Sequence, residues 1–206
     1  DPNPMLYDIA LTIGYDYDTP ASGARHILRV LPLSIPGRQR LIAGSVKVSP
    51  EPDEKSSLTD FFGNPTTAIM YRSQHGTLEI RMQARVQVDQ VEPVADFSPL
   101  VGKLQAELEA VWSMDGDSPH HLAGPSPRLA DNVEIAAYAR AMIKPGMTVR
   151  EAAYEICKRV YTDFKYDPEA TTVDSTPQEA FKMKRGVCQD FSHVMIIALR
   201  SLGIPA

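Results

Sequence analysis

The sequence is poor in cysteine and has no long apolar run. Its two cysteines, Cys157 and Cys188, are too few for a disulfide framework and are typical of a reducing compartment. No segment approaches the roughly 18 uninterrupted apolar residues of a membrane span. The first basic residue is Arg25, and no apolar leader precedes it. We therefore expect a cytoplasmic protein without a signal peptide and without membrane contact.

Basic residues are too few for binding nucleic acid through bulk charge. The 206 residues include 21 lysines and arginines against 26 acidic residues, which gives a formal net charge of −5. Apolar residues make up 43% of the chain and charged residues 23%, which excludes a wholly disordered protein. The length allows one ordinary domain or two small ones.

The first half of the chain carries a strand pattern. Residues 7–17 and 78–88 alternate between apolar and polar positions, so each segment has one apolar face. The pattern predicts an antiparallel β-domain over residues 1–92, arranged as a sandwich. Shorter extended runs, separated by turns rich in proline and glycine, lie at 26–31, 41–48 and 67–72.

Helical spacing replaces the strand pattern after residue 92. We expect a linker or insertion over residues 93–130, with a short helix through Leu104 and Leu108. A longer helical region follows over residues 131–206, where Asp131 begins a helix that ends near Ile143.

Two further helices begin at strong N-terminal signals. Thr148 with Glu151, and Thr176 with Glu179, place a capping hydroxyl three residues before a glutamate. Each pair predicts a helix start. Gly186 is expected to end the second helix as its left-handed residue.

The last helical segment, CQDFSHVMIIALRSLG, predicts a helix with one buried face. Cys188 lies at the edge of that apolar stripe, with its side chain expected to point inward. His193 lies five residues later, a rotation of about 500° that places it on the far side of the helix. The stripe consists of Phe191, Val194, Met195, Ala198, Leu199 and Leu202.

The position of Cys188 suits a nucleophile. A thiol at a helix N-terminus faces the positive end of the helix dipole, which favours the thiolate. The free N–H groups there can bind an oxyanion. From position alone, the favoured interpretation is a buried cysteine that acts as a small hydrophobe. Cys157 is expected to pack in the core, and His120-His121 lacks further ligands, so we expect no metal site.

The run STPQEAFKMKRGVCQDFSHVMIIALRSLGIPA resembles the nucleophile segment of the transglutaminase-like superfamily. The preceding FKYDP, which contains Tyr166, also resembles the family's pattern. In the first half, YDIALTIGYDYDTPASGARHILRVLPLSIPGRQ, DFFGN and LEIRMQARVQV resemble the β-domain found in many bacterial members. The resemblance implies an α+β protein. Its N-terminal antiparallel β-sandwich domain would precede the helical part of a papain-like, transglutaminase-like core, truncated before its β-sheet.

The resemblance implies acyl transfer or hydrolysis at amide and peptide carbonyls through a cysteine thioester. Cys188 would be the nucleophile and its backbone N–H an oxyanion donor, with Tyr166 and Gln189 as supporting residues and no cofactor. The family's histidine and aspartate would lie beyond residue 206, so residues 1–206 alone would be inactive. We expect a protein or peptide substrate, and a homo-oligomer formed through the bare apolar face of the truncated core. The alternative is a non-catalytic scaffold or protein-interaction module.

Overall fold

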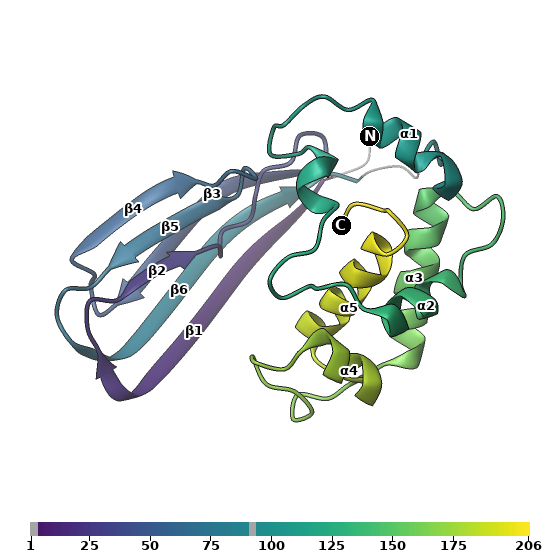
Figure 1. The fold of residues 1–206 in the computed structure, drawn as a ribbon. Coiled ribbons are helices and arrows are strands. Elements are labelled where there is room, and N and C mark those ends of the chain that lie inside the picture. Colours follow the sequence, from purple (N-terminus) through teal and green to yellow (C-terminus); the bar gives the residue numbers. More distant parts are fainter. Residues whose placement is uncertain (1–3, 91–93) are drawn as a thin grey trace. The chain divides into compact units, whose positions relative to one another are not determined.

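The computed structural model describes residues 4–90 and 94–206. The chain forms two compact units, one up to Val94 and one from Ala95 onward. Strands make up the first unit, and helices dominate the second (Figure 1). The expected α+β class, with a sheet domain before a helical region, is therefore confirmed.

Six strands build the first unit as two antiparallel sheets. Strands β1, β6 and β3 form one sheet with β6 in the centre, and β2, β5 and β4 form the other with β5 in the centre. Both sheets contribute side chains to one apolar core. The strands are β1 (Met5–Ala21), β2 (Arg25–Leu28), β3 (Gln39–Ser49), β4 (Glu54–Thr59), β5 (Pro65–Met70) and β6 (His75–Val88).

The alternation in β6 is confirmed as a buried face. Every second side chain from Leu78 to Val86 is buried, because β6 has a neighbour on each side. The expected apolar face of β1 is covered only in part, by the packing of Ile13 and Tyr17 against the core. Tyr7, Ile9, Leu11 and Tyr15 are 38–50% exposed, because β1 pairs only with β6 and lies at the edge of its sheet.

Strand β4 was not predicted from the sequence. All six of its residues are exposed, and the segment EKSSLT has no alternation of apolar and polar side chains. Backbone hydrogen bonds pair β4 with β5, and they do not require an alternation of apolar and polar side chains.

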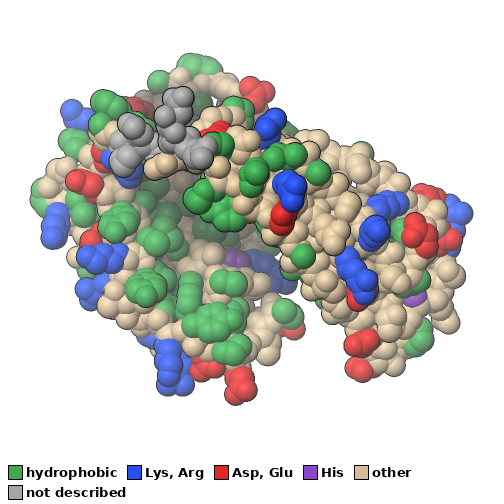
Figure 2. Space-filling view, turned by 180° about the vertical axis from the view of Figure 1, so that it is seen from behind, with side chains coloured by type: hydrophobic (Ala, Val, Ile, Leu, Met, Phe, Trp, Pro, Cys, Tyr) green, Lys and Arg blue, Asp and Glu red, His purple; other side chains and the backbone are tan. Residues whose placement is uncertain are grey.

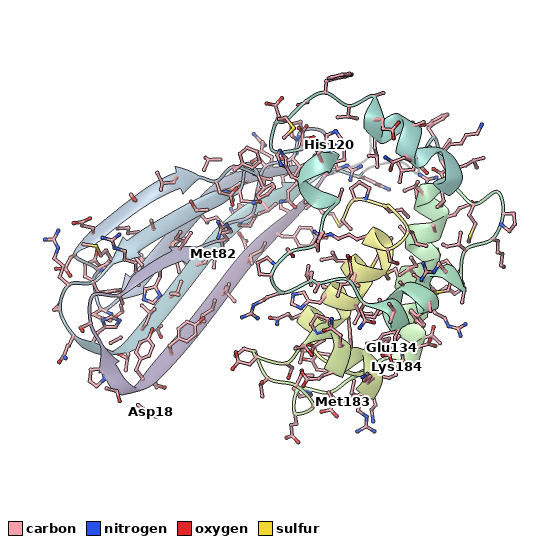
Figure 3. The ribbon with its side chains drawn as sticks, viewed as in Figure 1. Asp18, Met82, His120, Glu134, Met183 and Lys184 are labelled. Carbon is pink, nitrogen blue, oxygen red and sulfur yellow. The ribbon has the colours of Figure 1, made fainter. Side chains whose placement is uncertain are left out.

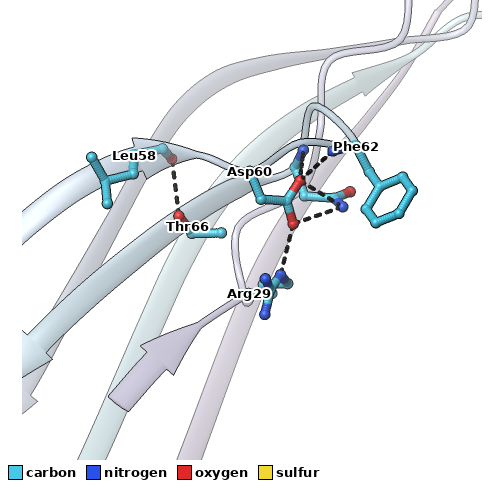
Figure 4. Close-up of polar contacts among 6 residues, drawn as sticks. Arg29, Leu58, Asp60, Phe62 and Thr66 are labelled. Carbon is cyan, nitrogen blue, oxygen red and sulfur yellow. Dashed lines mark hydrogen bonds and ion pairs between the residues drawn. The ribbon is translucent and has the colours of Figure 1, made fainter. Parts of the chain in front are cut away.

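The DFFGN loop joins β4 to β5 around one carboxylate (Figure 4). Asp60 Oδ1 accepts hydrogen bonds from the backbone N–H groups of Phe62 and Asn64, at 3.0 and 2.9 Å. Asp60 Oδ2 accepts one from Arg29 Nε at 2.8 Å. Arg29 and the N–H donors of Asn64 lower the pKa of Asp60 to about 2. The ion pair thus fixes the loop against the end of β2.

The second unit contains five α-helices. Thr148 caps α3 and Thr176 caps α4, each in a reciprocal pair with the glutamate three residues later, as predicted. Helix α2 begins one residue later than expected, because Asn132 rather than Asp131 accepts from the first free N–H groups. The elements are α1 (Leu104–Glu109), α2 (Val133–Arg140), α3 (Val149–Asp163), β7 (Lys165–Tyr166), α4 (Pro177–Met183), β8 (Arg185–Gly186) and α5 (Cys188–Arg200), with 3₁₀ turns at Val101–Lys103 and Pro119–Leu122.

Helix α5 lies against α2, α3 and α4. Its Val194, Ile197 and Ala198 are at most 2% exposed, so the expectation of a bare apolar face on this helix is wrong. The neighbouring helices cover that face. The expected homo-oligomer therefore stays a prediction, and the apolar face of α5 does not support it. Leu104, from the segment expected to be a linker, also belongs to the core of this unit.

The surface carries both signs of charge. Lysine and arginine side chains lie beside aspartate and glutamate over the face drawn in Figure 2. One such pair joins Arg85 Nε to Asp8 Oδ1 at 2.7 Å, across β6 and β1. In the described part of the chain, no helix has the length and apolar character that a bilayer crossing needs.

Candidate active site

Cys188 is the first residue of α5, and its side chain is exposed. The expectation that it points inward is wrong. The buried residues of α5 are Asp190, Val194, Ile197, Ala198 and Leu199. Cys188 is about 200° of helical rotation away from Asp190, so it lies on the opposite side of the helix start. The thiol is therefore accessible to a reaction partner.

The backbone at the start of α5 offers free donors to that thiol. Val187 is extended and precedes the helix, and the first helical bond runs from Phe191 N to Val187 O at 3.2 Å. The N–H groups of Cys188 and Gln189 therefore have no acceptor within the helix. They can bind an anion or a developing oxyanion at the positive end of the helix dipole.

Tyr166 lies beside the residues that precede Cys188. Strands β7 and β8 pair in parallel, with Tyr166 opposite Gly186. Lys165 N donates to Lys184 O, and Asp167 N donates to Gly186 O, each at 2.9 Å. The pairing brings the FKYDP segment to the helix start, and Tyr166 is 63% exposed there. Gln189 is half-buried one residue after the thiol.

Asp190 is a residue of this site that sequence reasoning missed. Its side chain is only 2% exposed, and its Oδ2 accepts hydrogen bonds from Val187 N at 2.8 Å and from Thr171 Oγ1 at 2.7 Å. An acid at the third helical position was the available signal. It escaped notice because the residue before the helix is Val187, not the serine or threonine that normally accompanies it.

Lys184 lies between α4 and β8, four residues before Cys188. It adopts the left-handed conformation with φ 54°, so the expectation that Gly186 ends α4 in this way is wrong. Figure 3 shows Lys184 at the end of α4. Its Nζ lies over the rings of Tyr138, Phe164 and Phe181, and burial lowers its pKa.

Cys157 and the histidines occupy other places. Cys157 is exposed on α3, so its expected place in the core is wrong, and both cysteines are free thiols. His193 lines a cavity of about 320 Å³ together with Arg128 and Gln178. The ring Nε2 atoms of His120 and His121 lie 2.8 and 2.9 Å from backbone carbonyl oxygens. Within residues 4–90 and 94–206, no cluster of three histidine, cysteine or acidic side chains could hold a metal ion.

The chain is similar to proteins of one family over both of its units. Residues 7–87 match the family model of the bacterial transglutaminase-like N-terminal region, and residues 136–206 match that of the transglutaminase-like superfamily. An uncharacterized protein of Mycobacterium tuberculosis is 27% identical over 82% of this chain and 54% of its own length. One of Mycobacterium leprae is 28% identical over 93% of this chain and 65% of its own length. The chain thus spans about half to two thirds of these relatives.

A solved structure has the same fold. The crystal structure of a "Putative Cysteine Protease" from Cytophaga hutchinsonii matches 98% of this chain and 65% of its own chain, with a TM-score of 0.70 and 22% identity. Both family matches and the fold agree with the resemblance read from the GVCQDFSH segment. Residues 136–206 therefore form a region of the transglutaminase-like superfamily, preceded over residues 7–87 by a bacterial transglutaminase-like N-terminal region.

Proposed function

We propose that this chain carries the nucleophile of a thiol enzyme that acts on amide or peptide carbonyls. The observation that carries the proposal is the exposed thiol of Cys188 at the first position of α5. At that position the thiol and the free N–H groups of the helix start face the same solvent-accessible end of the helix. A nucleophile and an oxyanion donor are the two groups that acyl transfer needs together.

The reaction proceeds in two steps. The Cys188 thiolate forms a bond to the carbonyl carbon, and the carbonyl electron pair moves to oxygen, where the N–H groups of Cys188 and Gln189 stabilise it. The carbon–nitrogen bond then breaks, the amine takes a proton from a general acid, and a thioester on Cys188 remains. Water or a second amine attacks the thioester and releases the thiol.

The acceptor decides between hydrolysis and cross-linking. Water as the acceptor gives a protease or amidase, and an amine gives cross-linking. We favour water by family analogy, with a protein or peptide as the substrate and no cofactor. The histidine and aspartate of the family would follow Ala206 in a longer chain, and Tyr166 and Gln189 would support the oxyanion site.

The experiment compares variants of the full gene product on casein, with and without a labelled primary amine. We expect Cys188→Ala to abolish both peptide release and amine incorporation, and Cys157→Ala to leave them unchanged. Loss of a nucleophile lowers the rate by several orders of magnitude. Mass spectrometry of a trapped acyl-enzyme should place the added mass on the peptide that contains Cys188.

Full activity in Cys188→Ala would refute the nucleophile assignment. A gene product that shows no turnover and no acyl-enzyme on any amide substrate would instead favour the non-catalytic scaffold. Residues 1–206 alone should show no turnover, since a cysteine without its proton acceptor loses most of its rate.

A further inference from the structure

A buried carboxylate, that of Asp190, lies two residues after Cys188 in the first turn of α5. Asp190 is 2% exposed, although burial of a charged group is costly unless the group is paired. Two donors bind one of its oxygens, Oδ2: the N–H of Val187 at 2.8 Å and the hydroxyl of Thr171 at 2.7 Å. The carboxylate of Asp190 therefore links the start of α5 to the loop that contains Thr171, 19 residues earlier in the chain.

The Thr171 bond adds to the backbone bonds and the Arg185–Asp167 ion pair that attach this loop to the nucleophile segment. Lys165 N donates to Lys184 O and Asp167 N donates to Gly186 O, which pairs the backbones as far as Gly186. Backbone pairing ends there. The side chain of Asp190 continues the attachment past the end of β8, at the first turn of α5.

Gly186 makes room for this arrangement. A Cβ at Gly186 would lie 2.9 Å from Asp190 Cγ, and closer still to Oδ2. The absence of a side chain at Gly186 thus allows the carboxylate to approach the backbone that precedes Cys188. Asp190 Oδ2 also accepts from the N–H of Val187. The N–H groups of Cys188 and Gln189, next to the thiol, have no acceptor within the helix.

We propose that Asp190 is a positioning residue for Cys188. By accepting from Val187 and Thr171 with one oxygen, it holds the turn before α5 in a single orientation. The thiol and the free N–H groups of Cys188 and Gln189 then keep a fixed relation to one another. This inference rests on the proposed function, because it gives Asp190 a role only if Cys188 is the reacting group.

The experiment measures alkylation of Cys188 by iodoacetamide from pH 5 to pH 10, with Cys157 in the same sample as the internal control. Asp190→Asn and Asp190→Ala are a matched pair, because both remove the charge but only asparagine keeps an oxygen that can accept from both donors. We expect the Cys188 rate of Asp190→Ala to fall about fivefold below that of Asp190→Asn, and its pH profile to move to higher pH, since the helix start loses its cap.

Thr171→Val removes one of the two donors at constant shape and keeps the Asp190 charge, so its Cys188 rate should fall below that of the native protein. The Cys157 rate should be equal in all four proteins. Equal Cys188 rates in Asp190→Asn and Asp190→Ala would overturn the proposal. A parallel change at Cys157 would also overturn it, because it would indicate general loosening of the helical unit. Labelling needs no turnover, so a gene product without enzymatic activity would leave this result intact and refute only the proposed function.

Discussion

The ammonium group of Lys184 lies 3.3 Å from the centroid of the Phe181 ring. The rings of Tyr138 and Phe164 each lie 4.5 Å from the same nitrogen, which has no hydrogen-bond partner among the described residues. Three aromatic faces therefore replace water around this cation. The arrangement fixes the chain four residues before Cys188, at a residue whose left-handed backbone conformation is unfavourable for any side chain.

The charge on Lys184 should make stability depend on pH. Burial lowers its pKa below the usual 10.5, so in the pH range just below 10.5 the unfolded chain binds more protons than the folded protein. Stability from this group therefore rises as the pH increases through that range. We expect the melting temperature of the native protein to rise relative to that of Lys184→Met between pH 8 and pH 10.5.

Lys182→Met, an exposed substitution in the same helix, is the matched control. It should show a difference from the native protein that does not change with pH. A constant difference for Lys184→Met as well would contradict the prediction.

Gly186 should not tolerate alanine. The added Cβ would lie 2.9 Å from Cγ and 3.0 Å from Cβ of Asp190, both in a buried side chain that cannot move into solvent. We expect Gly186→Ala to lower the free energy of unfolding by about 1–3 kcal/mol, measured by urea denaturation. Gly102→Ala, where nothing lies within 4 Å of the added atom, should stay within about 0.5 kcal/mol of the native protein.

Ionised Asp96 should stabilise the start of α3 at pH values above the pKa of its carboxyl group. Its Oδ2 accepts from Thr148 Oγ1 at 2.5 Å, and its Oδ1 accepts from Ser98 N at 2.9 Å. These donors lower the pKa of Asp96 to about 2 from a usual 3.8. The unfolded chain therefore takes up a proton first, and the stabilisation is lost as the pH falls from about 4 to about 2.

The measurement compares the native protein with Asp96→Asn by thermal unfolding. The native protein should be the more stable at pH 6, and the difference should shrink as the pH falls toward 2. A difference that is the same at pH 6 and pH 3 would count against this assignment.

The two thiols should differ in reactivity although both are exposed. Cys188 lies at the N-terminus of α5 and Cys157 in the middle of α3, so only the first faces the positive end of a helix dipole. At pH 7 we expect iodoacetamide to label Cys188 at least about threefold faster than Cys157, read by peptide mass spectrometry. In urea-unfolded protein the rates should become equal. Equal rates in the folded protein would show that the helix start does not activate Cys188.

Sequence patterns alone determined the parts of this protein that depend on nearby residues. The alternation in residues 78–88 predicted a buried strand, and the pairs Thr148–Glu151 and Thr176–Glu179 predicted two helix starts. Each of these signals acts within a few residues, so it is readable without the fold. The GVCQDFSH motif likewise identified the family.

Tertiary structure decided which side of each element is covered. The stripe on α5 suggested an inward Cys188, but packing against α2, α3 and α4 buries Asp190 and leaves Cys188 outside. Thr171 and Asp190 meet although 19 residues separate them, because the pairing of β7 with β8 brings their segments together. Helical periodicity gives the relative angles of side chains, but the direction of burial depends on where neighbouring elements lie. Only the fold supplies those neighbours, and so only the fold decides that Asp190 is buried and Cys188 is exposed.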